Sequence, residues 1–105
     1  MEINSTPLCD VLVIETNKLE DTRGSFMRLF CQQALTDILA DRNIIQINKS
    51  VTTQKGAIRG LHFQYPPHAE IKFVRCLKGA IFDVAVDLRK DSRTFLQWHS
   101  EILTP

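Results

Sequence analysis

The feature that most constrains the fold is a regular alternation of apolar and polar residues, which returns in several segments of the second half of the chain. Residues 44–51, 71–77 and 80–88 each follow it. Successive side chains of a β-strand point to opposite faces, so an alternating segment separates its apolar residues from its polar ones. Each segment is therefore predicted to be a strand. The polar face of 44–51 either meets solvent or lines the inside of a barrel.

Shorter patterns predict the remaining elements. Strands are predicted over residues 8–14, 26–30, 56–64 and 95–103. Leu35, Ile38 and Leu39 are spaced as on one face of a helix, which predicts a short amphipathic helix over 33–42. Six or seven short strands with one small helix are typical of an all-β sandwich or barrel. Without an internal repeat or a low-complexity linker, residues 1–105 are predicted to form a single domain.

Composition excludes several classes of protein. The chain is 44% hydrophobic and 24% charged, as in globular proteins, and its 13 basic and 12 acidic residues give no broad surface for nucleic acid. No apolar run is long enough to span a membrane, and the first residues lack the basic start of a signal peptide. The three cysteines are odd in number and widely spaced, which favours reduced thiols. A cytoplasmic protein that binds neither nucleic acid nor membrane is predicted.

The segment 56–64 carries the clearest sign of a binding site. It reads Gly-Ala-Ile-Arg-Gly-Leu-His-Phe-Gln, and Lys72 and Asp83 follow on later predicted strands. A strand that only fills a core would consist of Val, Ile, Leu and Phe. The mixture of glycine, cation, imidazole and amide therefore indicates that one face of this strand meets a ligand.

These motifs resemble the dTDP-4-dehydrorhamnose 3,5-epimerase family over nearly the whole chain. The matching residues are Asp21-x-Arg23-Gly24-x-Phe26, Gln46-x-Asn48-x-Ser50, Gly56-x-x-Arg59-Gly60-Leu61-His62-Phe63-Gln64, Pro66-Pro67, Lys72-x-Val74-Arg75, 79–89, Ser92-x-Thr94-Phe95 and Trp98. The resemblance implies a cupin-like β-barrel, or jelly roll, of which this chain is the N-terminal portion without the C-terminal strands. It also implies a homodimer that uses neither metal nor organic cofactor. The expected reaction is epimerisation of a nucleotide-linked 4-keto-6-deoxy sugar at C3, C5 or both, in dTDP-rhamnose or related deoxysugar biosynthesis.

Epimerisation beside a ketone needs a base, a group that stabilises the enolate, and an acid on the opposite face. His62 suits the base and Lys72 the enolate, while Asp83 could orient either of them. Each residue also has a structural interpretation. His62 could be an ordinary structural histidine and Lys72 a solvated charge, and Asp83 or Asp87 could cap a turn or pair with an arginine.

The resemblance further implies a set of substrate-binding residues. Arg59 is expected on the diphosphate, Gln46 and Asn48 on the nucleotide sugar, and Arg23 and Phe26 on an arm that recognises the nucleotide and reaches toward the partner subunit. The family usually has a glutamate where this chain has Arg28.

Alternation would place Arg59 and His62 on opposite faces of one strand, so a local irregularity is predicted at Gly60. A His62 ring that faces bulk water, far from Lys72 and Arg59, would contradict the assignment. His68 and His99 are predicted to be surface or satisfied histidines. Metal-binding cupins use a second histidine and a glutamate where this chain has Gln64 and Lys72, so no metal site is predicted.

The family extends past residue 105, and its later segment brings the tyrosine acid, a second histidine and the aspartate that pairs with the base. This chain has one tyrosine, Tyr65, beside Pro66. The alternative hypothesis is therefore a non-catalytic remnant, or a nucleotide-sugar-binding module that retains Arg59, Gln46 and Asn48.

Overall fold

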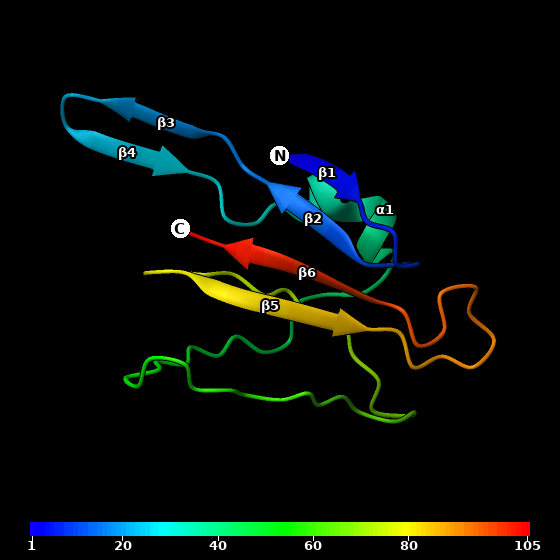
Figure 1. The fold of residues 1–105 in the computed structure, drawn as a ribbon. Helices are drawn as coiled ribbons and strands as arrows, with labels where there is room; N and C mark the ends of the chain where they lie inside the picture. The colour runs from blue at the N-terminus through cyan, green and yellow to red at the C-terminus, as the bar shows by residue number, and fades with distance from the viewer. The chain divides into compact units, whose positions relative to one another are not determined.

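The computed structural model describes all 105 residues and contains six strands and one short helical segment. The strands are β1 (Glu2–Ser5), β2 (Leu12–Glu15), β3 (Lys18–Asp21), β4 (Gly24–Met27), β5 (Ile81–Val86) and β6 (Trp98–Leu103), as Figure 1 shows. They pair in sequence order into three antiparallel two-stranded sheets. The prediction of an all-β fold with one short helix is confirmed.

The chain divides into two compact units, which are described separately below. Unit 1 comprises residues 1–42 and 75–105 and contains every strand and the helix, whereas unit 2 comprises residues 43–74. The single domain over 1–105 stays a prediction.

β1 and β2 form the first sheet of unit 1, and Ile3 lies opposite Ile14 across it. Only β2 was expected, as part of the predicted strand 8–14. The loop before β2 is closed by Thr6, whose hydroxyl donates to the Val11 carbonyl oxygen at 2.8 Å and accepts from the Leu8 amide at 3.2 Å. A threonine side chain thus satisfies loop groups that no strand pairs.

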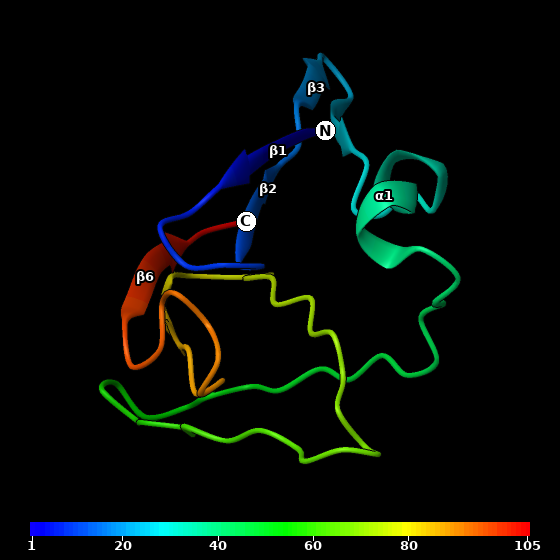
Figure 2. The same cartoon turned by 90° about the vertical axis from the view of Figure 1, so that its right-hand side faces the viewer.

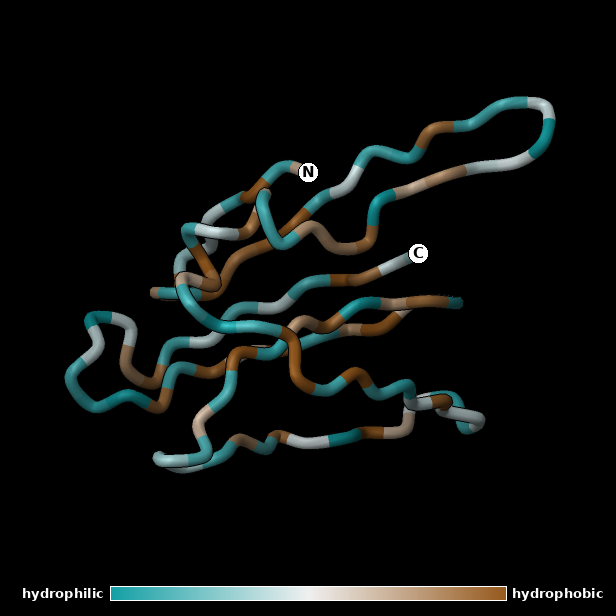
Figure 3. The backbone as a smooth tube through the Cα atoms, turned by 180° about the vertical axis from the view of Figure 1, so that it is seen from behind, coloured by the Kyte–Doolittle hydropathy of each residue, from teal (hydrophilic) through white to brown (hydrophobic).

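β3 and β4 form a hairpin with a two-residue loop between Asp21 and Gly24. Gly24 has φ +137°, a conformation that L side chains rarely adopt, and the Asp21 carboxylate accepts the Arg23 amide at 2.8 Å. Figure 3 shows that the tip of this hairpin is hydrophilic. The predicted strand 26–30 is correct for Phe26 and Met27 only, because the chain leaves its pairing with β3 after Met27.

β5 and β6 form the longest sheet, in register from Ile81 opposite Leu103 to Val86 opposite Trp98. The predicted strands 80–88 and 95–103 are confirmed in their central parts. Both are shorter than predicted at the connection, where the Asp87 amide donates to the Gln97 carbonyl oxygen at 3.0 Å and the Leu96 amide donates to the Asp87 carbonyl oxygen at 2.7 Å.

The predicted helix over 33–42 is present but shorter. A 3₁₀ turn (Gln33–Leu35) leads into α1 (Thr36–Leu39), which ends at Ala40 because that residue has φ +52°. Leu35 and Leu39 are both buried, as their helical spacing predicts, and form the core of unit 1 with Leu8 and Cys76. No helix has the length and hydropathy of a membrane-spanning segment.

The strands predicted over 44–51, 56–64 and 71–77 are wrong, because the structure has no strand between β4 and β5. Figure 2 shows these residues without an arrow or a coil. A strand requires a neighbour for its N–H and C=O groups and a cover for its apolar face. In residues 43–74 neither is present: no ladder forms and Ile45 is 96% exposed. The alternating sequence of these residues therefore does not lead to a paired strand.

Candidate functional site

Lys72 is held by an acidic side chain of unit 2. Its ammonium nitrogen lies 3.1 Å from Glu70 Oε1, and Gln64 Nε2 donates to the same oxygen at 3.2 Å. The side chains of Lys72 and Glu70 are 44% and 41% exposed. Lys72 is thus an exposed charge with an acidic partner, and its interpretation as a solvated charge stays open beside the catalytic one.

Arg59 binds the segment that precedes it in unit 2. Its Nε donates to Thr52 Oγ1 at 3.0 Å and its Nη2 to the Val51 carbonyl oxygen at 3.4 Å. Gln46 and Asn48 are exposed. The guanidinium therefore has protein partners on one side and retains further N–H donors for a ligand.

His62 lies against the backbone of Gly60. Gly60 has φ +95°, and a β-carbon at this position would come within 3.3 Å of His62 Nδ1. The predicted irregularity at Gly60 is confirmed, although it interrupts no strand because no ladder forms there. A larger residue at position 60 would be strained by the positive φ and would crowd the imidazole.

The structure does not join His62 to the other residues predicted to act with it. His62 is exposed, and no hydrogen bond or ion pair links it to Lys72 or Arg59. The expectation of an enclosed imidazole beside two cations is therefore not met within unit 2. The roles of these residues stay predictions.

Asp83 lies on β5 in unit 1, directly opposite Glu101 of β6. Two carboxylates in this position repel each other. His99 Nε2 lies 2.8 Å from Glu101 Oε1, within hydrogen-bond distance. The prediction that His99 is a satisfied histidine is confirmed, and its partner is an acid two residues along the same strand.

Arg23 and Phe26 lie together along the β3–β4 hairpin, at an open hollow of about 440 Å³. It is lined by Leu19, Glu20, Asp21, Arg23, Gly24, Ser25 and Phe26. The guanidinium of Arg23 donates to Asp21 and holds the pKa of that carboxyl below its ordinary value. Arg28 borders a second hollow of about 170 Å³, which also contacts Phe26.

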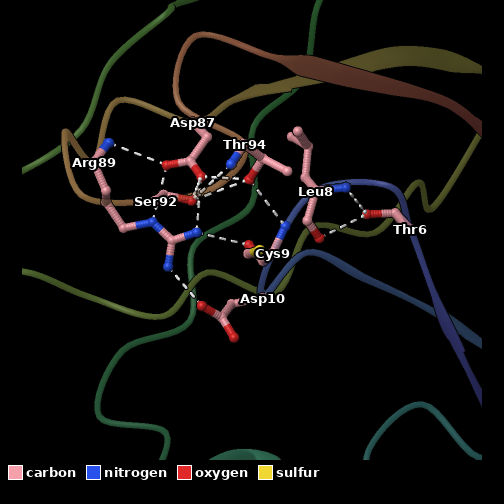
Figure 4. Close-up of polar contacts among 8 residues, drawn as sticks. All are labelled: Thr6, Leu8, Cys9, Asp10, Asp87, Arg89, Ser92 and Thr94. Atoms are coloured by element: carbon pink, nitrogen blue, oxygen red, sulfur yellow. Dashed lines mark hydrogen bonds and ion pairs between the residues drawn. The ribbon is translucent and has the colours of Figure 1, made fainter.

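Asp87 is buried within a set of hydrogen bonds that Figure 4 shows. Its carboxylate accepts from Arg89 Nε at 2.9 Å, from Thr94 Oγ1 at 2.7 Å and from Ser92 Oγ at 2.5 Å. The Arg89 guanidinium, followed by the Ser92 hydroxyl, holds the pKa of Asp87 well below its ordinary value against the opposing effect of burial. The structural interpretation of Asp87, pairing with an arginine in a turn, is confirmed.

The same set of hydrogen bonds ties the β5–β6 connection to the β1–β2 loop. Arg89 donates to Asp10 Oδ2 at 2.5 Å and to the Cys9 carbonyl oxygen at 2.9 Å, and the Cys9 amide donates to Thr94 Oγ1 at 3.3 Å. The Thr94 hydroxyl also lowers the pKa of the Cys9 thiol. These residues stabilise unit 1, since both oxygens of the buried Asp87 carboxylate accept hydrogen bonds from the protein itself.

Sequence reasoning did not pair Glu70 with Lys72, or Glu101 with His99. Each glutamate lies two residues from a cation or imidazole, Lys72 or His99, so that both members of each pair share a face in an extended segment. This i, i+2 spacing is the signal that could have found them.

Comparison with known proteins gives consistent results. A family model described as dTDP-4-dehydrorhamnose 3,5-epimerase matches residues 5–105. Proteins of that name from Sinorhizobium fredii and Shigella flexneri are 41% and 43% identical to this chain, over 99% and 93% of it. The aligned region is 53% and 54% of those proteins, so the chain spans about half the length of the curated relatives it matches.

Solved structures agree with the sequence relatives. The crystal structure of the Bacillus anthracis dTDP-4-dehydrorhamnose 3,5-epimerase with TDP and PPi bound is 39% identical and gives a TM-score of 0.89. It matches 98% of this chain and 59% of its own. An epimerase from Elizabethkingia anophelis also gives 0.89, at 37% identity. The predicted cupin-like epimerase fold is the fold that these structures share with the chain.

Proposed function

We propose that this chain, which belongs to the dTDP-4-dehydrorhamnose 3,5-epimerase family, acts as an epimerase. The expected substrate is a nucleotide-linked 4-keto-6-deoxy sugar, which is epimerised at C3, C5 or both. The observation that carries the proposal is the family match over residues 5–105, which includes His62 and Lys72. The relatives at 41% and 43% identity bear the name of this activity.

The chemistry is divided among a few side chains. The neutral imidazole of His62 removes the proton from the carbon next to the ketone, and the electron pair moves into the carbonyl to form an enolate. The ammonium of Lys72 stabilises the negative oxygen. An acid on the opposite face, which in the family is a tyrosine of the later segment, returns a proton to the same carbon, and this step inverts the centre and regenerates the ketone. Asp83 contributes a negative charge that orients or tunes this machinery.

Nucleotide binding is assigned to a second group of residues. Arg59 pairs with the diphosphate, because a guanidinium donates two parallel hydrogen bonds to phosphate oxygens. Gln46 and Asn48 hold the nucleotide sugar by hydrogen bonds, and Arg23 and Phe26 meet the nucleotide at the hairpin hollow. The TDP in the Bacillus anthracis epimerase supports a thymidine nucleotide as the carrier.

The wider setting of the protein follows from the same premise. We propose that it acts as a homodimer in the cytoplasm, in dTDP-rhamnose or a related deoxysugar pathway. Arg28, which replaces the acid usual in the family, reverses a charge beside Phe26 and is proposed to alter which nucleotide is accepted.

Solvent deuterium exchange tests the proposal. The protein is incubated in D₂O with dTDP-4-keto-6-deoxyglucose, and loss of the C3 and C5 proton signals is followed by NMR. We expect exchange in the unsubstituted protein and its loss, by at least about 100-fold, in His62→Ala. His68→Ala is the matched control, because His68 is an exposed histidine of the same unit outside the proposed site, and should leave the rate unchanged.

The same experiment separates the alternative, a non-catalytic module that binds nucleotide sugars. Binding of the nucleotide sugar without exchange, and weaker binding in Arg59→Ala, would establish the module and overturn the epimerase. Exchange that survives His62→Ala would overturn the assignment of the base.

A further inference from the structure

One carboxylate oxygen in unit 2 joins two side chains of the segment proposed for catalysis. Glu70 Oε1 lies 3.1 Å from Lys72 Nζ and accepts from Gln64 Nε2 at 3.2 Å. The three residues come from positions two and six apart along the chain, all within residues 43–74. The arrangement places a single acceptor between a charged donor and an amide donor.

We propose that Glu70 is a positioning residue that fixes the Lys72 ammonium, and that Gln64 fixes Glu70 in turn. The assignment of a catalytic consequence rests on the proposed function of Lys72 as the enolate-stabilising cation. Glu70 itself acts on Lys72 and not on the substrate.

The need for such an anchor follows from the lysine side chain. The ammonium group lies at the end of a flexible four-carbon chain, and holding that chain in one conformation costs conformational entropy. An acceptor for one of its N–H groups selects a subset of those rotamers. Because Gln64 donates to the same oxygen, the Glu70 carboxylate is itself restricted, so the ammonium is anchored to a group that has its own support.

The geometry leaves the ammonium able to act. Lys72 has three N–H donors, and Glu70 Oε1 takes one of them, so two remain for a developing oxyanion. The pair is half-exposed and is screened by solvent, so it contributes little to stability. Removal of Glu70 should therefore appear in the rate of the reaction and not in unfolding.

Two substitutions test the role in the intact protein. Glu70→Ala removes the anchor, and we expect kcat for deuterium exchange to fall about tenfold with KM changed less than about twofold, because a misplaced catalytic group lowers the rate of the bound complex. Glu70→Gln keeps an acceptor oxygen at the same place and should retain at least about half of kcat. Asp91→Ala, which removes an exposed carboxylate without a partner, is the control and should match the unsubstituted protein.

Three kinetic outcomes would overturn the proposal. Glu70→Ala with an unchanged kcat would show that Lys72 needs no anchor. Glu70→Gln as slow as Glu70→Ala would show that the negative charge, and not the hydrogen-bond acceptor, is what matters. A faster Glu70→Gln would show that Glu70 attenuates the charge of Lys72 instead of placing it.

An NMR measurement decides the anchoring independently of activity. The side-chain amide of Gln64 is observed in protein labelled with ¹⁵N-glutamine, and its resonance should move in Glu70→Ala and in Lys72→Ala, since both donors share one oxygen. Lys55→Ala, a lysine elsewhere in unit 2, should not move it. An unmoved resonance in both variants would overturn the anchor. Absence of exchange in the unsubstituted protein would overturn the proposed function alone, because the Gln64 resonance still reports the contact.

Discussion

Unit 1 and unit 2 differ in how they use their backbone and side chains. Unit 1 pairs its strands into three sheets, buries Leu35 and Leu39, and satisfies the buried Asp87 carboxylate with neighbouring donors. Unit 2 has no ladder and none of its residues is buried. Its polar contacts are short-range, as between Arg59 and Thr52 or between Lys72 and Glu70.

The difference separates stability from chemistry. Residues that stabilise the fold lie in unit 1, whereas His62, Lys72 and Arg59, which we propose for the reaction, lie in unit 2. Substitution of a buried residue of unit 1, such as Leu35 or Asp87, should therefore act on unfolding. Substitution of His62, Lys72 or Arg59 should instead act on binding and rate. The following predictions test this division, in order of the size of the expected effect.

Amide hydrogen exchange should show the largest contrast. Amides that pair β5 with β6 should exchange roughly 100-fold or more slowly than those of residues 44–51, which donate to no strand partner. Exchange followed residue by residue by NMR, with rates corrected for each amide's intrinsic chemistry, measures this. Equal protection in the two segments would show that unit 2 pairs its backbone in solution.

Truncation of an apolar side chain should lower the stability strongly in unit 1 and hardly at all in unit 2. Leu35 is 1% exposed, and Leu35→Ala should lower the free energy of unfolding by about 2 to 5 kcal/mol. Ile45 is 96% exposed, and Ile45→Ala should change it by less than about 0.5 kcal/mol. Urea unfolding followed by circular dichroism compares them. A large loss in Ile45→Ala would mean that this isoleucine is covered in solution.

Acid should weaken unit 1 through Asp87. Its folded-state pKa is depressed by Arg89 and Ser92, so its contribution is fully present above the pKa of the unfolded carboxyl, about 3.9, and is lost as pH falls toward the folded value. Asp87→Asn should therefore unfold at lower urea concentration than the unsubstituted protein at pH 7, and the difference should shrink below about pH 4. Asp91→Asn is the control. The prediction would be contradicted if the urea midpoints of Asp87→Asn and Asp91→Asn changed with pH in the same way.

The smallest effect concerns a single hydroxyl. Thr94→Val removes the donor to Asp87 and the acceptor for the Cys9 amide, and should cost about 1 kcal/mol of unfolding free energy. Thr53→Val, an exposed threonine of unit 2, should cost nothing measurable. Thermal unfolding of the two variants side by side is sufficient. A loss in Thr53→Val as large as in Thr94→Val would remove the contrast between the units.

Local patterns predicted α1, β5 and β6 of unit 1 but not β1 or β3, and they predicted strands in unit 2 that are absent. The spacing of Leu35 and Leu39 gave a helix with a buried face, and the alternation of residues 80–88 gave β5. The same alternation in 44–51 and 71–77 gave strands that are absent. Periodicity reports which face of a segment is apolar, but a strand also requires a partner, and no local pattern names one.

The candidate site shows the same limit. Residue type and family resemblance selected His62, Lys72 and Arg59, and the glycine between His62 and Arg59 predicted the irregular backbone at Gly60. Neither residue type nor family resemblance indicates where a side chain points. Neither therefore predicted the contact of Lys72 with Glu70 or of His99 with Glu101.

The sequence by itself determined the family of this chain, its all-β character and the residue types available for proton transfer, because these follow from the order of side chains along the chain. Only the structure decided that Asp87 is a buried structural carboxylate, that Asp83 lies opposite a second acid, and that Glu70 Oε1 lies 3.1 Å from Lys72 Nζ. Each of these depends on the distance between atoms of different residues, and that distance is fixed when the backbone pairs and turns.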